Sequence, residues 1–318
     1  MTFIASVIAK DGVAIVADSF VTTLDQSIDR DSFLDYLSKT KNKKSIPIED
    51  IVDLFNKRPS HTRNFADKLF QFDQFSAIST AGSAYINGKE IKDIVKSIAI
   101  DIQADEGVYY ARDIEDILKD LCSKVRVEVF EHLKNNDFGE TDFVFSHFNR
   151  GKNKPQVFVI RMRASSKDNY DVADDTIVSY SEKSHLKIIT DGQDGFVDRL
   201  IFGSLYTNII DVKDFFIEYI IKKCKPKSTK KAEIISEIED MSFLENIIKN
   251  DVFYIKFREL SLQEAVDLAS LLIKIIMDIQ VYTEKIPTVG GLIRLAIINK
   301  ETGFQWISGD KIVPSKII

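Results

Sequence analysis

Two apolar runs open the chain, and a short polar turn separates them. Residues 3–9 and 13–17 are almost wholly apolar, and the residues between them are polar or glycine. An Asp-Gly pair between apolar runs is a strong hairpin signal, so the pattern predicts two antiparallel strands joined by a tight turn at Asp11-Gly12. Chain termini usually fray unless something holds them, and Thr2 stands directly before the first strand.

A long polar segment, 24–63, follows this hairpin and has the composition of an insertion. It contains a basic run at 39–45, which is typical of a solvated loop. Short helical patterns at 30–37 and 49–55 interrupt it. We expect the segment to be largely irregular.

Beyond this segment, strand-like and helix-like patterns arrive in blocks. Apolar runs predict strands at 68–72, 75–81, 142–148, 156–162, 176–180, 186–190, 292–299 and 303–308. Amphipathic periodicity predicts helices at 89–103, from 114 onwards, at 195–221 and at 261–279. The last helix opens with a capping box, because Glu264 follows Ser261 by three residues.

The order of these blocks favours one fold class. Early strands joined by hairpins are antiparallel, and helices that arrive in blocks disfavour a doubly wound parallel sheet. Two stacked sheets with helices on both outer faces fit the order, so we expect an α+β fold, a four-layer αββα sandwich. We expect a single domain over 1–318, with insertions at about 24–63 and about 222–258.

The composition narrows the class of protein. A chain of 318 residues, 44% of them hydrophobic, can bury a large core. A net charge of −6 argues against a general nucleic-acid binder. No apolar run is long enough to span a membrane, and Lys10 and Asp11 interrupt the pattern of a signal peptide. We therefore expect a soluble, cytoplasmic protein with no nucleic-acid or membrane partner.

The sequence holds no clear metal or redox motif. Cys122 and Cys224 stand singly, so neither a zinc site nor a disulfide scaffold is indicated. The four histidines are scattered and form no metal pair and no Ser/His/Asp order. We expect no metal and no cofactor, and we expect Cys122 to be buried on the apolar stripe of a helix.

Three blocks resemble the proteasome β-subunit and HslV group of threonine peptidases, which are N-terminal nucleophile (Ntn) hydrolases. The first block is Thr2…Lys10-Asp11-Gly12-Val13…Ala17-Asp18-Ser19…Val21-Thr22. The second, Lys68-Leu69-Phe70-Gln71…Ala81-Gly82, is similar to the Lys-bearing strand of the family and to the glycine that ends its next strand. The third joins the helical segment 262–269 to Val289-Gly290-Gly291. The first two blocks match the family's separations without a gap.

The resemblance implies a catalytic set of four residues, Thr2, Asp18, Lys68 and Gly82. Amide hydrolysis needs a nucleophile, a base and donors for the oxyanion. Removal of Met1 would give Thr2 a free amine with a pKa of about 7.7–8.0, so Thr2 would be both nucleophile and base. Lys68 would lower the pKa of the Thr2 hydroxyl or relay its proton. Asp18 would hold the ammonium of Lys68, and the Gly82 N–H would face the oxyanion.

The same resemblance implies a binding site for the substrate. The pocket for the residue before the cut bond would be lined by Val21, Ala66, Thr80 and Ala84. None of these side chains is charged, so we expect the pocket to take a neutral, medium-to-large apolar side chain. Thr22 and Ala84 would offer backbone groups to an extended peptide, in the manner of an added strand.

The chain departs from the family at three auxiliary positions. Gln193 stands where the family carries a Ser between glycines, and Ile286 and Val289 stand where it carries an Asp and a Ser. Those family residues orient the amine and help to relay its proton. Their replacement leaves three alternatives open: a slower enzyme, an inactive subunit, or a site rewired through Asp191, Asp194 or Glu284.

The function that we expect is hydrolysis of peptide bonds by a threonine peptidase. The resemblance implies a peptide or unfolded-protein substrate and assembly into a homo-oligomeric ring, with the outer helices as contact surfaces. The family includes members with ATPase partners, and nothing in this sequence indicates one. Two other functions stay open: an Ntn amidase acting on small amides, and a catalytically inactive, proteasome-like structural subunit.

Overall fold

A computed structural model of the chain describes most of its two ends and its middle. The described residues are 2–40, 52, 54–64, 66–136, 138–164, 172–173, 178–179, 188–193, 195, 197, 221–223, 230–231, 260–283 and 286–308. Most of the helix expected at 195–221, most of the expected insertion at 222–258, and Cys224 lie outside these residues.

The first sheet brings both ends of the chain together. It has five strands in the order β13-β1-β2-β14-β15, and every neighbouring pair is antiparallel. The strands are β1 (Phe3–Ile8), β2 (Gly12–Ala17), β13 (Ile188–Gly192), β14 (Arg294–Asn299) and β15 (Gly303–Ser308). The strands predicted at both ends of the sequence are therefore confirmed, and β2 lies directly beside β14.

The turn of the first hairpin differs from the prediction in one respect. The bond from Ala9 N to Gly12 O, at 2.9 Å, puts Lys10 and Asp11 at the centre of the turn, and Gly12 already belongs to β2. Gly12 is not among the glycines with positive φ. A Cβ there would lie 2.4 Å from the backbone oxygen of Ile298, so the glycine is needed for the close approach of β14 rather than for the turn.

The second sheet has six strands. They follow the order β11-β10-β9-β6-β5, and β12 also pairs with β10. The strands are β5 (Leu69–Asp73), β6 (Ser76–Ala81), β9 (Thr141–Asn149), β10 (Lys154–Ala164), β11 (Val172–Ala173) and β12 (Val178–Ser179). The sequence predicted all of these except β11, and it also missed the short pair β7 (Tyr85–Ile86) and β8 (Lys89–Glu90).

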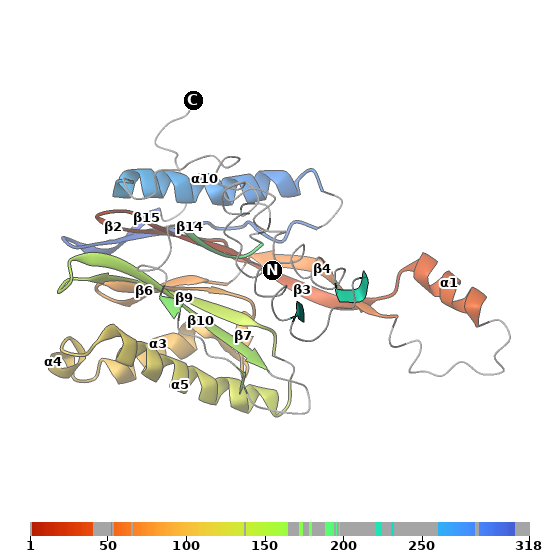
Figure 1. Cartoon of the computed structure of the whole chain (residues 1–318), viewed down its shortest axis with the longest axis horizontal. Helices are drawn as coiled ribbons and strands as arrows, with labels where there is room; N and C mark the ends of the chain where they lie inside the picture. The colour runs from red at the N-terminus through yellow and green to blue at the C-terminus, as the bar shows by residue number, and fades with distance from the viewer. Residues whose placement is uncertain are drawn as a thin grey trace.

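Helices lie outside each sheet (Figure 1). On one side, α10 (Leu262–Gln280) packs on β1, β2 and β14. On the other side, α3 (Ile91–Ile102) and α5 (Ile114–Leu133) cover the second sheet, with the short α4 (Glu106–Tyr109) between them in sequence. The capping box of Ser261 and Glu264 is confirmed at the start of α10. The helices predicted at 89–103, from 114 and at 261–279 are thus present.

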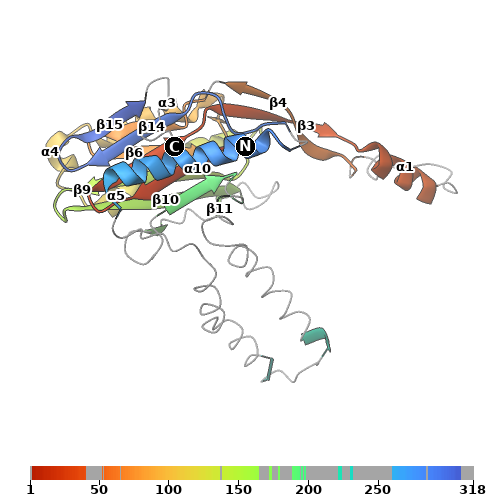
Figure 2. The ribbon, with the colours of Figure 1, turned by 90° about the horizontal axis from the view of Figure 1, so that it is seen from above.

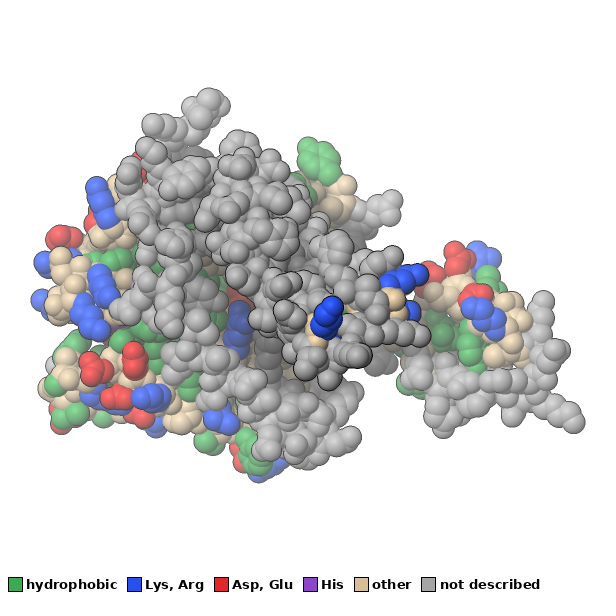
Figure 3. All heavy atoms as spheres, viewed as in Figure 1, with side chains coloured by type: hydrophobic (Ala, Val, Ile, Leu, Met, Phe, Trp, Pro, Cys, Tyr) green, Lys and Arg blue, Asp and Glu red, His purple; other side chains and the backbone are tan. Residues whose placement is uncertain are grey.

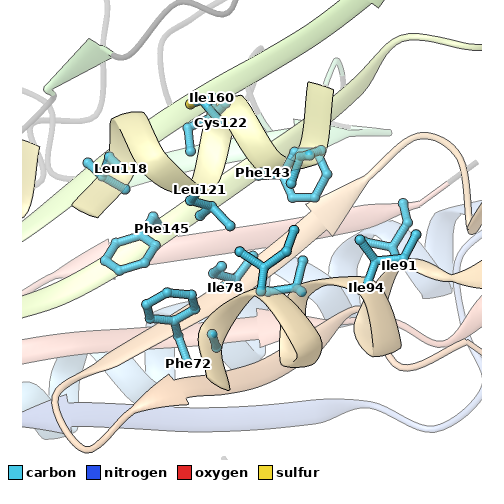
Figure 4. Packing of buried hydrophobic residues seen from close by; sticks show 14 of the residues in the cluster. Phe72, Ile78, Ile91, Ile94, Leu118, Leu121, Cys122, Phe143, Phe145 and Ile160 are labelled. Carbon is cyan, nitrogen blue, oxygen red and sulfur yellow. The ribbon is translucent and has the colours of Figure 1, made fainter. Parts of the chain in front are cut away.

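Three buried apolar clusters separate these layers. Alternation along β1 divides its side chains, because Phe3 packs toward α10 while Ile4 faces the second sheet. The third cluster joins the second sheet to α3 and α5 and contains Cys122, which is buried as expected (Figure 4). Phe72 and Phe145 pack there edge to face, with ring centroids 5.2 Å apart.

A long arm projects from the layered body (Figures 1 and 2). It consists of β3 (Phe20–Ser27), α1 (Arg30–Lys39) and β4 (Asn56–Asn64), with β3 and β4 paired antiparallel. The helical pattern at 30–37 is therefore confirmed, but the expectation of a largely irregular segment is wrong for the two strands. Residues 41–51 of the basic run and of the second helical pattern lie outside the described residues.

The surface of the described part is mixed in charge. Figure 3 shows Lys, Arg, Asp and Glu side chains interspersed at one end of the layered body and again on the arm. Within the described part of the chain, no helix is both long enough and apolar enough to cross a bilayer. The architecture is mixed α+β with antiparallel sheets.

Candidate active site

A buried ion pair joins the two sheets at the end where β2 stops and β5 starts. Asp18 follows β2, and Lys68 directly precedes β5. The Nζ of Lys68 lies 2.7 Å from Oδ1 of Asp18, and the two residues are only 5% and 0% exposed. Lys68 also donates to the carbonyl of Phe20 at 2.5 Å. Its side chain therefore points into the protein and not into solvent.

Both carboxylate oxygens of Asp18 are fully used. Oδ1 accepts from the Phe3 amide at 3.1 Å as well as from Lys68. Oδ2 accepts from the amides of Phe20 and Gly290, each at 3.2 Å. A buried carboxylate is tolerated only when it is paired and hydrogen-bonded, and this one meets both conditions.

Burial and pairing act on this pair in opposite directions. Burial raises the pKa of Asp18 above its ordinary value, while Lys68 and the amides of Phe3 and Gly290 act to lower it. Burial lowers the pKa of Lys68, while Asp18 acts to raise it. A lysine whose pKa lies below its ordinary value gives up a proton more easily, which suits a residue that relays one.

The backbone connects Thr2 to this ion pair. The Phe3 amide that binds Asp18 is the amide that follows Thr2. The carbonyl of Thr2 accepts from the Gln193 amide at 2.6 Å, so β13 fixes the start of β1 from the other side. Gly192 makes that approach feasible, because its φ is +92° and a Cβ there would lie 2.0 Å from the Thr2 oxygen. Thr2 is 3% exposed.

Gly82 ends β6 at the same end of the second sheet. Thr80, two residues earlier, donates its amide to the carbonyl of Lys68 at 2.9 Å. Gly82 has a φ of +112°, and a Cβ there would lie 2.2 Å from the backbone oxygen of Glu140. Only glycine fits this position without strain, and the residue is exposed at the surface.

The residues expected to bind substrate lie around this end, on three different segments. Ala66 and Thr80 are buried, and the Ala66 amide donates to the carbonyl of Ser19 at 3.2 Å. Val21 and Thr22 are half-buried at the start of β3, where β4 pairs with one edge of that strand. Thr22 carries a buried hydroxyl that has no hydrogen-bond partner among the described residues.

The backbone of Ala84 already makes one hydrogen bond within the protein. Its carbonyl already accepts a hydrogen bond from the amide of Ile91, at 3.2 Å. This bond fixes Ala84 to the start of α3, so the carbonyl has a partner before any substrate arrives. That Thr22 and Ala84 offer backbone groups to an extended peptide stays a prediction.

The three auxiliary positions, and the acidic residues that could replace their function, lie on different segments of the chain. The Gln193 backbone binds Thr2, and Asp191 accepts from the Gly192 amide at 2.6 Å. Val289 is buried and Ile286 is exposed. Asp194 and Glu284 lie outside the described residues.

Sequence reasoning assigned no role to two residues that complete the site. The Ser19 amide donates to the carbonyl of Gly290 at 3.1 Å, and the Ser19 hydroxyl accepts from the Leu292 amide at 2.7 Å. Both Ser19 and Gly290 belong to the blocks that carry the family resemblance. Their hydrogen bonds connect segments far apart in sequence, which a local pattern does not reveal.

An open pocket of about 660 Å³ lies along β5 and α3, and the two sequence neighbours of Lys68, Asp67 and Leu69, are among its lining residues. Its lining includes Asp67, which pairs with Lys92 at 2.5 Å and with Arg294 at 3.2 Å. Burial opposes the effect, but these two cations hold the pKa of Asp67 below its ordinary value. None of the four expected catalytic residues lines this pocket, so we place the candidate chemistry at Asp18 and Lys68 instead.

The described residues contain no group of three or more His, Cys, Asp or Glu side chains arranged to hold a metal ion. No family model matches this chain, and no curated protein matches it significantly in sequence.

Proposed function

We propose that the chain is an N-terminal threonine hydrolase that cuts peptide bonds, with Thr2 as its nucleophile. The observation that supports this most directly is the buried pair of Asp18 and Lys68, which is hydrogen-bonded to the amide that follows Thr2. Burying a lysine and a carboxylate costs desolvation free energy, and buried groups with perturbed pKa values cluster at functional sites.

The fold is compatible with this proposal. Helix α10, the two antiparallel sheets and the pair α3 and α5 follow the layer order expected of the αββα sandwich of Ntn hydrolases. The proposal needs the chain start and the lysine to come together from the two facing sheets. Here Thr2 precedes β1 and Lys68 precedes β5, in the first and second sheet.

The reaction begins once the bond between Met1 and Thr2 has been cut. The freed amine of Thr2 takes the proton of its own hydroxyl, and Lys68 stabilises the oxygen that remains. The oxygen attacks the peptide carbonyl, and the Gly82 amide donates to the oxyanion that forms. The amine gives its proton to the leaving nitrogen. Water then attacks the ester on Thr2, with the amine as base, and releases the acid product.

The substrate in this proposal is an extended peptide. Val21, Ala66 and Thr80 carry no charge and surround the candidate site, so an apolar side chain before the cut bond fits best. Among the described residues, β3 pairs with another strand, β4, along one edge. The start of its second edge is where the peptide would add as a further strand. Assembly into a ring, with outer helices as contact surfaces, belongs to the same proposal.

Kinetics of two Thr2 variants and one control variant test the proposal. Thr2→Val keeps the branched shape and removes the hydroxyl, and Thr2→Ser keeps a hydroxyl, so we expect Thr2→Val to lose turnover of fluorogenic peptides and Thr2→Ser to keep part of it. Thr23→Val, on β3, is the matched control. Intact-mass measurement shows whether Met1 has been removed.

Other outcomes favour the other functions. Retained Met1 in purified protein, with no peptide turnover, would favour the inactive structural subunit. Turnover of small amides but of no peptide would favour the amidase. Full activity of Thr2→Val would contradict Thr2 as the nucleophile, whichever substrate is cut.

A further inference from the structure

Three consecutive backbone amides before β14 point at two side chains. The amides of Thr288 and Val289 both donate to Oε1 of Gln280, at 2.6 and 3.1 Å. The next amide, that of Gly290, donates to Oδ2 of Asp18 at 3.2 Å. One turn therefore connects the last residue of α10 to the buried carboxylate of the candidate site.

The two bonds from Thr288 and Val289 fix the orientation of the Gln280 side chain. A backbone N–H needs an acceptor, and only the oxygen of a glutamine amide can accept. The Nε2 of Gln280 is buried and has no hydrogen-bond partner among the described residues. The contribution of this side chain therefore comes from its oxygen and not from its nitrogen.

Packing restricts the rest of the turn. Thr288 and Val289 are 5% and 2% exposed, so water does not readily replace the side chain of Gln280 as acceptor. Gly290 has a φ of +151°, and a Cβ there would lie 2.8 Å from the ring of Phe20. The carbonyl of Gly290 accepts from the Ser19 amide. With that side fixed, Gln280 determines where the other side of the turn lies.

We propose that Gln280 is a positioning residue, whose side-chain oxygen holds this turn so that the Gly290 amide stays on Asp18. The effect of Gln280 on catalysis rests on the proposed function, because it requires Asp18 to hold Lys68 beside Thr2. The effect of Gln280 on the titration of Asp18 does not rest on it. Among the described residues, Asp18 faces the ammonium of Lys68 and the amides of Phe3, Phe20 and Gly290.

The direct test is a carboxyl ¹³C NMR titration of Asp18 in the full chain, with Asp18→Asn used to assign its signal. Gln280→Met keeps the size of the side chain and removes the acceptor. We expect the titration midpoint of Asp18 to rise by about one pH unit, because a hydrogen bond to a charged group is lost or weakened. Lys274→Met, an exposed position on the same helix, should leave the midpoint unchanged.

An unchanged Asp18 midpoint in folded Gln280→Met overturns the inference. Gln280→Ala also lacks the acceptor and replaces the Met variant in this test if that variant does not fold. This measurement needs no enzyme activity. An inactive parent chain would therefore contradict the proposed function and still leave the role of Gln280 to be decided by the titration.

Kinetics supply the second arm of the test. If Gln280 positions Asp18, Gln280→Met lowers kcat by about tenfold and changes KM by less than about twofold, since the substrate itself is not touched. Gln280→Glu presents an acceptor oxygen at the same place and should recover most of kcat. A Glu variant that is folded but as slow as the Met variant contradicts the role assigned to the oxygen.

Discussion

At the scale of single residues, the site is organised around one carboxylate. Each oxygen of Asp18 accepts two hydrogen bonds, and the donors come from β1, β3, the residue before β5 and the turn before β14. Four separate segments of the chain thus depend on one buried charge. Such a group is hard to change singly, because removal of any one partner leaves another without its bond.

The Asp18–Lys68 pair gives a prediction about stability. Removing one partner of a buried ion pair leaves a buried charge unpaired, so we expect Lys68→Met to lower the free energy of unfolding by about 3–5 kcal/mol. The double variant with Asp18→Asn should be less destabilised than Lys68→Met alone, because no buried charge remains. Chemical denaturation of the four proteins measures this. A double variant with the summed loss would contradict a buried, charged pair.

Gly82 gives a second prediction, with Gly88 as its matched control. Both glycines have positive φ, +112° and +73°, but only at Gly82 would a Cβ meet backbone, whereas at Gly88 nothing lies within 4 Å. Gly88→Ala should cost about 1–2 kcal/mol from backbone strain. Gly82→Ala should cost more and also abolish peptide turnover, because the strand end must shift. Equal effects of the two changes on stability and turnover would contradict the role given to the Gly82 amide.

At the scale of elements, a second polar cluster lies at the other end of β6 from Gly82. The Ser76 hydroxyl is within 2.9 Å of Nδ1 of His147 and donates to Asp73 at 3.0 Å, and the hydroxyl of Tyr109 on α4 also donates to Asp73. The cluster joins the β5–β6 turn, β9 and α4. Ser76 is fully buried, and its hydroxyl holds these segments of the second sheet and its helices together.

His147 in this cluster predicts how stability depends on pH. Burial lowers its pKa from an ordinary value of 6.5, although the charge of Asp73 opposes the shift. The unfolded chain therefore binds the proton more readily, so the contribution of His147 is complete above about pH 6.5 and is lost as the pH falls through its folded pKa. We expect His147→Gln to weaken the fall in unfolding free energy between about pH 6.5 and pH 5. An unchanged slope would contradict a partly buried, neutral His147.

At the scale of the whole molecule, the layered body was largely predictable from sequence. Apolar runs and amphipathic stripes are local patterns. At β1 and α10 the burial of these apolar side chains between layers favours the same secondary structure that the local pattern predicts. The arm strand β4 was not predictable, because its sequence lacks alternation and contains Pro59, where the pairing with β3 shifts register. The link of Gly290 to Asp18 spans 272 residues, and no local pattern contains it.

The arm gives a prediction about the whole molecule. Helix α1 buries none of its residues, and Ser27 pairs with Asn56 at the last pair of the hairpin. Replacing residues 28–55 by Asn-Gly should therefore change the free energy of unfolding of the body by less than about 1 kcal/mol. Chemical denaturation, with the full chain as reference, checks this. A much larger loss would show that the arm belongs to the folded core.

The most direct measurement of the central claim is reaction of the full chain with an electrophile that traps an N-terminal threonine, followed by peptide mass mapping. The account predicts one adduct, on Thr2, that is absent in Thr2→Val and strongly reduced in Lys68→Met. Lys92→Met, which breaks the partly exposed pair with Asp67, should still form the adduct. Full-length protein with a free Thr2 amine and no adduct on that residue would contradict the account.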